Sequence, residues 1–212
     1  MATWAEWFPD VVPQVPDCPQ PIVEHELRRA AQAFFDGTRA WNVLLDPVAV
    51  LADKQTVSII ADDSGQEVVR IEAASFDGRR VEVYPSEVMD SLFGDDWTLH
   101  TGTPSAITMD GPTTVRLYPT PNSASVTGLK CRVSVRPSDT SDGIPDEYRR
   151  KYREPIATGA KARLMIYVCR PWSNPEMAAM YGVAFAAAIA DGCVKAAKAF
   201  GSARIPSRPT WC

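Results

Sequence analysis

The sequence predicts an α+β fold in which a helical body carries an inserted antiparallel β-sandwich or barrel lobe. Apolar residues follow a helical spacing near the start and near the end of the chain, and short β-branched segments separated by turn residues fill the middle. Because the strands are grouped between helices and do not alternate with them, the segregated α+β class is expected. At 212 residues the chain is long enough to bury a core without disulfides or metal ions.

The first helix is predicted from Ile22 to about Gly37. Its apolar positions recur at intervals of three and four, with charged residues between them: Ile22, Val23, Leu27, Ala30, Ala31, Phe34 and Phe35. The segment before it, from Trp4 to Gln20, contains four prolines among apolar residues. Proline does not fit a helix interior or a central strand, so this segment is predicted to be an extended arm with aromatic side chains.

The middle of the chain predicts an antiparallel meander. The strand segments are Thr56–Ile60, Val68–Ile71, Arg80–Tyr84, Ala106–Met109, Thr114–Tyr118 and Leu129–Val135. Asp63-Ser64-Gly65, Asp77-Gly78 and Asp110-Gly111 fall in the gaps, where glycine supplies the positive φ of a tight turn. The run from Pro85 to Phe93 predicts a short helix that Gly94 ends.

Two long helices are predicted after Ile144-Pro145. Pro155 must kink the first of them or begin a new helix, because it removes one internal hydrogen bond. The last helix runs from about Glu176 to Phe200, with Gly201 as its C-cap. The predicted organisation is an arm and first helix over 1–41, an inserted β-lobe over 42–143, C-terminal helices over 144–201 and an extended tail over 202–212.

Composition narrows the function classes. The formal net charge is −4, so no overall basic field favours binding to a phosphate backbone. Five cysteines without a C-x-x-C pair suggest neither a zinc site nor a disulfide framework, and we expect reduced, mostly buried thiols. We expect no signal peptide and no membrane segment, since the most apolar stretch, Met177–Ala190, is short for a bilayer span.

Catalytic signatures are absent from the sequence. It contains no G-x-S-x-G, H-E-x-x-H, P-loop or G-x-G-x-x-G pattern, so we expect no enzyme activity, no cofactor and no metal. His25 and His100 are interpreted as surface or hydrogen-bonded histidines, and Asp62-Asp63 and Asp95-Asp96 as turn residues. The basic run Arg149-Arg150-Lys151 with Arg153 is interpreted as a solvated helix face or subunit contact in preference to a DNA site.

The aromatic residues of the two termini allow two interpretations. Leaving large apolar side chains in water forgoes roughly 1.5–3 kcal/mol each. Both arms therefore either fold back on their own domain or reach a neighbouring subunit. The candidate subunit and portal contacts are Trp4, Trp7, Phe8, Arg204, Arg208 and Trp211.

Short motifs in a characteristic order resemble the head-to-tail adaptor, or connector, family of tailed bacteriophages. They are Cys18-Pro19 followed by Ile22, Leu27, Arg28, Ala30, Ala31, Phe34, Thr38 and Trp41; Pro47; Leu117-Tyr118-Pro119-Thr120-Pro121; Arg136-Pro137; Ile144-Pro145, Tyr148, Ile156, Gly159-Ala160 and Arg163-Leu164; and Pro171-Trp172, Asn174, Tyr181 and Phe185. The similarity runs from about Trp4 to Phe200, and Pro155 departs from the pattern.

This resemblance implies a virion structural protein that is assembled in the host cytoplasm and located in the neck between head and tail. It implies a homo-oligomeric ring of twelve copies that docks on the portal, contacts a tail, tail-terminator or nozzle protein, and conducts DNA without reading its sequence. A different class remains open, a β-sandwich module that binds a ligand or host molecule, with the helices as its mount. A hydrolase with an unfamiliar site has only scattered Asp, Glu and Ser residues in its favour.

Overall fold

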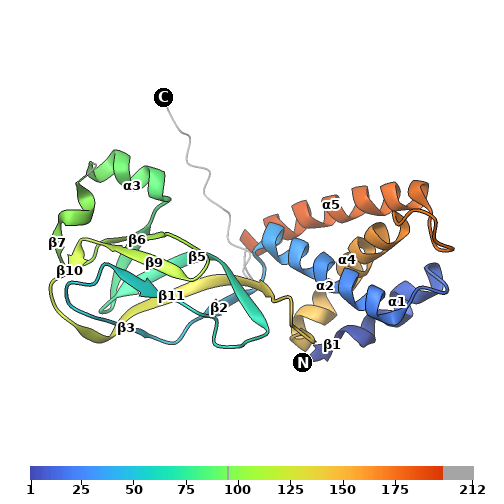
Figure 1. Cartoon of the computed structure of the whole chain (residues 1–212), viewed down its shortest axis with the longest axis horizontal. Coiled ribbons are helices and arrows are strands. Elements are labelled where there is room, and N and C mark those ends of the chain that lie inside the picture. The colour runs from blue at the N-terminus through green and yellow to red at the C-terminus, as the bar shows by residue number, and fades with distance from the viewer. Residues whose placement is uncertain (95, 198–212) are drawn as a thin grey trace. The chain divides into compact units, whose positions relative to one another are not determined.

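The computed structural model describes residues 1–94 and 96–197, which form two compact units. The helical unit comprises 1–40 and 139–197, and the β-lobe comprises Trp41–Ser138 (Figure 1). The expected α+β class with segregated helices and strands is confirmed. Asp95, Phe200, Gly201 and the expected tail over 202–212 lie outside the described residues.

Three helices lie side by side in the helical unit: α2 (Gln20–Thr38), α4 (Asp146–Met165) and α5 (Pro175–Ala197) (Figure 1). The chain enters this unit through β1 (Ala2–Thr3), which pairs antiparallel with β12 (Gly143–Ile144). The prediction that the following segment is extended is wrong. It folds as η1 (Trp4–Trp7), α1 (Phe8–Val11) and η2 (Val12–Gln14), because Pro9 and Pro13 sit in the first turns of short helices, where a missing N–H costs nothing.

Helix α2 has the predicted amphipathic pattern but ends one residue later than expected. Its buried face consists of Val23, Glu26, Leu27, Ala30, Ala31, Phe34, Phe35 and Thr38. The helix stops at Arg39, whose left-handed backbone (φ 52°) lets its N–H donate to the Phe35 carbonyl at 2.9 Å. Gly37 is therefore not the stop signal, and it serves the packing of α2 against α5.

Helix α4 has the kink that Pro155 predicts. The break falls at Tyr152 (φ −119°, ψ 18°), three residues before the proline. The Tyr152 ring packs against those of Phe34 and Phe35, with centroid distances of 4.9 and 5.9 Å. The kinked region is thus held by the aromatic core of the helical unit.

Glycines let α5 approach its two neighbours closely. A Cβ on Gly159 of α4 would lie 2.7 Å from the Phe185 ring, and one on Gly37 of α2 would lie 2.6 Å from Ile189. In α5 itself, a Cβ on Gly192 would lie 2.6 Å from Thr38. Real Cβ atoms do not come this near, so these contacts require glycine.

The β-lobe is built on an eight-stranded sheet in the order β2-β11-β5-β6-β8-β9-β4, with β3 also paired to β11. The strand bounds are β2 Asn42–Leu44, β3 Val48–Val50, β4 Thr56–Ser58, β5 Gln66–Phe76, β6 Arg79–Val83, β8 Ala106–Met109, β9 Thr114–Tyr118 and β11 Ser125–Pro137. A small parallel pair, β7 (Thr101–Gly102) and β10 (Thr120–Pro121), lies outside this sheet.

The six predicted strands are all present, with shifted ends in four of them. Asp77 and Gly78 both have positive φ, and they join β5 and β6 as a two-residue hairpin. The expectation of a wholly antiparallel sheet is wrong, because β6 and β8 pair in parallel. A parallel neighbour needs a crossover, which α3 (Ser86–Phe93) and η3 (Trp97–Leu99) provide.

The Gly159 contact yields a direct test of the packing. Gly159→Ala is expected to lower the free energy of unfolding by about 1–3 kcal/mol, because the added methyl group meets the Phe185 ring. Thermal denaturation of the purified chain measures the effect. The matched control is Gly182→Ala in α5, where nothing lies within 4 Å of the added Cβ. That change should be neutral or raise stability by up to about 1 kcal/mol, and equal losses in both variants would contradict the packing.

Candidate assembly surfaces

Two of the predicted contact residues, Trp4 and Trp7, are buried within the helical unit itself. The Trp4 indole N–H donates to the Ser141 carbonyl at 2.7 Å, and the two indole rings lie 5.6 Å apart between centroids. Phe8 is partly buried. For the N-terminal aromatic residues the structure thus has the folded-back arrangement, while Arg204, Arg208 and Trp211 lie outside the described residues.

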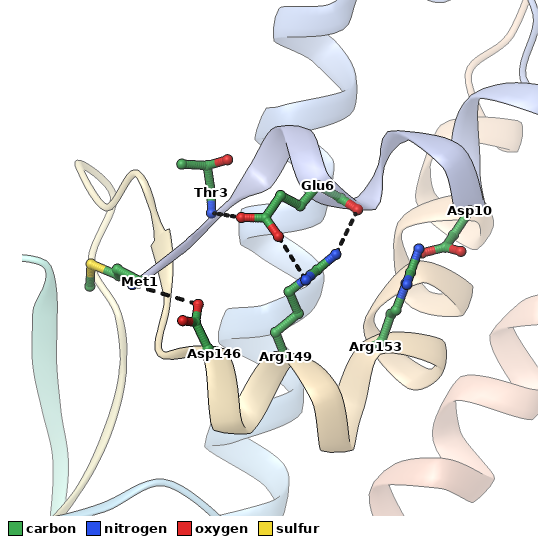
Figure 2. A network of polar contacts seen from close by, with 7 residues as sticks. All are labelled: Met1, Thr3, Glu6, Asp10, Asp146, Arg149 and Arg153. Atoms are coloured by element: carbon green, nitrogen blue, oxygen red, sulfur yellow. Dashed lines mark hydrogen bonds and ion pairs between the residues drawn. The ribbon is translucent and has the colours of Figure 1, made fainter.

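Ion pairs fasten the N-terminal segment to α4. The Arg149 guanidinium lies 2.7 Å from Glu6 Oε2 and also donates to the Glu6 carbonyl, and the Met1 ammonium lies 3.5 Å from Asp146 (Figure 2). One turn further along α4, Arg153 Nε donates to Asp10 Oδ2. This hydrogen bond and the attraction of the Asp10 carboxylate raise the pKa of Arg153 above its ordinary value. We call these contacts the N-terminal clasp.

The clasp divides the basic run into two kinds of residue. Arg149 and Arg153 fasten the arm, and the Arg149 guanidinium also lies 5.5 Å from the centroid of the Trp7 ring. Arg150 and Lys151 are exposed. The interpretation of this run as an exposed helix face is confirmed for Arg150 and Lys151, and their role as a subunit contact stays a prediction. The interpretation is wrong for Arg149, whose side chain is mostly buried and paired with Glu6.

A cleft of about 590 Å³ lies between α1 and the kinked part of α4. Its lining combines four basic side chains with two carboxylates and two apolar residues: Asp10, Arg150, Lys151, Arg153, Glu154, Pro155, Ala157 and Lys161. Beside it, the Lys161 ammonium lies 4.9 Å from the centroid of the Tyr181 ring. The lining of the cleft therefore has a net positive charge, although the formal net charge of the whole chain is −4.

Helix α5 exposes an uncharged surface, which we call the outer face. It consists of Ala179, Met180, Val183, Ala184, Ala186, Ala187 and Ala190, and it ends at the exposed ion pair of Asp191 and Lys195. The side chain of Met180 is 61% exposed and that of Val183 is 73% exposed, and no charged residue occurs from Met177 to Ala190. A contiguous exposed apolar surface of this kind marks an interaction site more often than single exposed apolar residues do.

The expectation that this apolar stretch is too short for a membrane span is wrong, because the helix extends well beyond Ala190. By length and composition alone α5 is able to cross a membrane, and only 11% of its most apolar 18-residue stretch is buried. A core helix of a soluble protein passes the same test when it is mostly covered. Length and composition therefore establish that α5 is apolar and largely uncovered, but they do not distinguish a protein partner from a lipid one.

A buried carboxylate lies elsewhere in the helical unit. Glu26 of α2 is 1% exposed, and its Oε1 accepts a hydrogen bond from the Tyr167 hydroxyl at 2.8 Å and from Arg29 at 3.4 Å. The hydrogen bond to Glu26, followed by burial, raises the pKa of Tyr167. His25 is exposed 4.0 Å from Glu26, and His100 lies 3.2 Å from the Tyr118 hydroxyl. Within 1–94 and 96–197, no group of three or more His, Cys, Asp or Glu side chains is arranged to hold a metal ion.

The cysteines only partly match their expectation. Cys131 is buried, and burial raises the pKa of its thiol to about 11, which makes it unreactive. Cys18 is half-buried, whereas Cys169 and Cys193 are exposed. The prediction of mostly buried thiols is therefore wrong for these last two: Cys169 lies in the turn between α4 and α5, and Cys193 lies on the exposed side of α5.

The comparison with known families decides the identity. A model of the SU10 adaptor protein family matches residues 3–205, nearly the whole chain. The chain belongs to the SU10 adaptor protein family. It is therefore a bacteriophage adaptor, a structural protein of the virion, as the resemblance implied at this coarser level. No curated protein matches the chain.

Sequence reasoning missed most of what the candidate surfaces of this adaptor depend on. The clasp pairs residues about 143 positions apart, for which no local pattern exists. The cleft follows from the same pairing, since Asp10 and α4 line it together. The outer face of α5 had one detectable signal, the run of uncharged residues from Met177 to Ala190.

The clasp predicts that neighbouring arginines contribute unequally to stability. Arg149→Ala should lower the free energy of unfolding by about 1–2 kcal/mol, because it removes an ion pair, a hydrogen bond to a backbone carbonyl and a contact with the Trp7 ring. Arg150→Ala, an exposed neighbour, is the control and should change it by less than about 0.5 kcal/mol. Urea denaturation followed by tryptophan fluorescence measures both free energies. Equal losses in the two variants would show that the clasp contacts of Arg149 do not contribute to stability.

Proposed function

We propose that this adaptor is a subunit of the head-to-tail connector ring in the neck of a tailed phage. The ring joins the portal to a tail, tail-terminator or nozzle protein and forms part of the DNA conduit. Its family membership supports an adaptor role, and the resemblance noted above implies a ring of twelve copies. A net charge of −4 fits a conduit, because a lumen that bound phosphates tightly would retard the genome.

The observation that carries this proposal is the outer face of α5. Its inner side packs on α2 and α4, whereas the side bearing Met180 and Val183 is exposed over several turns. In a virion protein that acts in an assembly, burial of such a face against a second copy supplies the association free energy. Small residues along it allow a helix of the neighbour to come near.

A ring with unlike contacts needs two different complementary faces on each subunit. From the sequence, the proposed contacts are the helices Ile156–Val168 and Met177–Phe200 with the aromatic arms. Ile156, Ala160 and Leu164 are buried inside the subunit, so these three side chains are not available for a subunit contact. Trp4 and Trp7 are also buried, and the proposal therefore rests on α5, on Ile166 and Val168 beyond α4, and on the tail residues Arg204, Arg208 and Trp211.

A matched pair of charge insertions tests the outer face. Val183→Glu is expected to leave the subunit folded and to prevent ring formation and portal docking, because a buried carboxylate without a partner is costly. Val126→Glu in the β-lobe makes the same change at a residue that is 83% exposed, compared with 73% for Val183. It should assemble normally.

The measurement is the mass of each protein by light scattering, alone and with purified portal rings. Assembly of the Val183→Glu protein at the wild-type level would rule out the outer face as a subunit contact. A wild-type chain that ignores the portal and floats with phospholipid vesicles would favour a membrane partner for α5. A monomer that ignores both and binds a small ligand through its β-lobe would favour the binding-module alternative.

Deletion of Ser202–Cys212 tests the proposed role of the C-terminal segment. The shortened chain is expected to keep its thermal unfolding temperature, because a segment of eleven residues with two prolines cannot form a core of its own, and to dock on the portal poorly. Circular dichroism and co-sedimentation with portal rings measure the two properties. Unaltered docking and unaltered virion assembly would remove Arg204, Arg208 and Trp211 from the contact set.

A further inference from the structure

The cleft between α1 and α4 differs in charge from the rest of the chain. Four cationic side chains, Arg150, Lys151, Arg153 and Lys161, face two carboxylates, Asp10 and Glu154. The net charge of the cleft lining is therefore +2, whereas the whole chain has 22 basic and 26 acidic residues and a net charge of −4. Like-signed side chains gathered in one concave site repel one another, and an anionic partner relieves that repulsion.

The backbone explains why these cations gather. Arg150, Lys151 and Arg153 lie beside the kink at Tyr152. On the helix after the kink, Lys161 lies on the same side as Glu154 and Ala157, at intervals of seven and four residues. The kink at Tyr152 and the absence of an N–H on Pro155 interrupt this helix beside the cleft. Asp10, fastened to Arg153, supplies the opposite wall from α1. The site is thus preorganised by contacts that the clasp already makes.

We infer that this cleft binds an acidic polypeptide segment of a neighbouring virion protein, an inference that rests on the proposed assembly function. Its volume of about 590 Å³ accommodates a few residues. Arginine and lysine form charge-assisted hydrogen bonds with carboxylates, and Arg150 has the planar fork that binds a carboxylate through two N–H groups.

The mixed lining favours a polypeptide over DNA. The phosphate and sugar oxygens of a DNA backbone accept hydrogen bonds and donate none, so Asp10 and Glu154 would face only repulsive groups. A peptide brings carboxylates for the cations and backbone N–H groups for the two acidic side chains. A duplex also presents a convex surface, whereas this site is concave.

The experiment uses the full chain and hexaglutamate as the probe, with isothermal titration calorimetry at low ionic strength. Arg150→Gln/Lys161→Gln removes two cleft charges and keeps side chains of similar length. Arg79→Gln/Lys130→Gln removes two charges from exposed positions of the β-lobe and is the matched control. Thermal unfolding of both variants verifies that the fold is intact.

The wild-type chain should bind one hexaglutamate per subunit, and the cleft variant should bind it about tenfold or more weakly. The control should differ from wild type by less than about twofold, as expected for charges outside the site. Equal binding by the cleft variant and wild type, or no binding by wild type, would overturn the inference. Tighter binding of inorganic phosphate or of a 20-base-pair duplex than of hexaglutamate would overturn it as well.

This outcome is separable from that of the proposed function. A wild-type chain that assembles and docks on the portal but shows no cleft-dependent peptide binding retains the connector function and loses this inference. A chain that binds hexaglutamate in the cleft but never assembles loses the connector function and retains the acidic-peptide site.

Discussion

The one-sided coverage of α5 is the constraint on which the rest of the molecule depends. On the inner side, Gly159 and Gly37 let the helix approach α4 and α2 until backbone and side chain touch. On the outer side, Met180 and Val183 remain in water. Burial of such a side chain contributes roughly 1.5–3 kcal/mol, and the isolated subunit does not gain this free energy. In the proposed ring, a neighbouring subunit would cover these side chains, which would connect the packing of a single chain with the adaptor family to which it belongs.

The kink in α4 gives the helical unit its second distinctive feature. Arg149 lies before the non-helical residue Tyr152 and Arg153 lies after it, and each fastens a different carboxylate of the N-terminal segment. The segment is thereby held with its own Trp4 and Trp7 buried, while Arg150 is exposed and lines the cleft. Pro155 lines the cleft together with Asp10 of α1, so the proline that accompanies the kink also forms part of this site.

Local patterns in the sequence predicted the features whose cause is local. The spacing in α2, the Pro155 kink and the Asp77-Gly78 hairpin each follow from a few adjacent residues. Features that depend on distant partners were missed or, like the folding back of the N-terminal arm, left open. The burial of Trp4 requires the Ser141 carbonyl, and the parallel pairing of β6 with β8 requires the crossover through α3. Likewise, the sequence predicted the last helix, but which of its sides stays exposed is decided by α2 and α4.

Two unlike surfaces on one helical unit have a physical use in a closed ring. Apolar burial is strong but carries little orientational information, since an alanine-rich helix face accepts a neighbouring helix in several registers. Charged contacts contribute less net free energy but penalise wrong pairings, because a displaced cation is left without its partner. An outer face that provides affinity and a charged cleft that fixes register would together restrict the neighbour to one position. A ring can close only if that position repeats identically at every interface, so a surface that specifies register is as necessary to it as one that provides attraction.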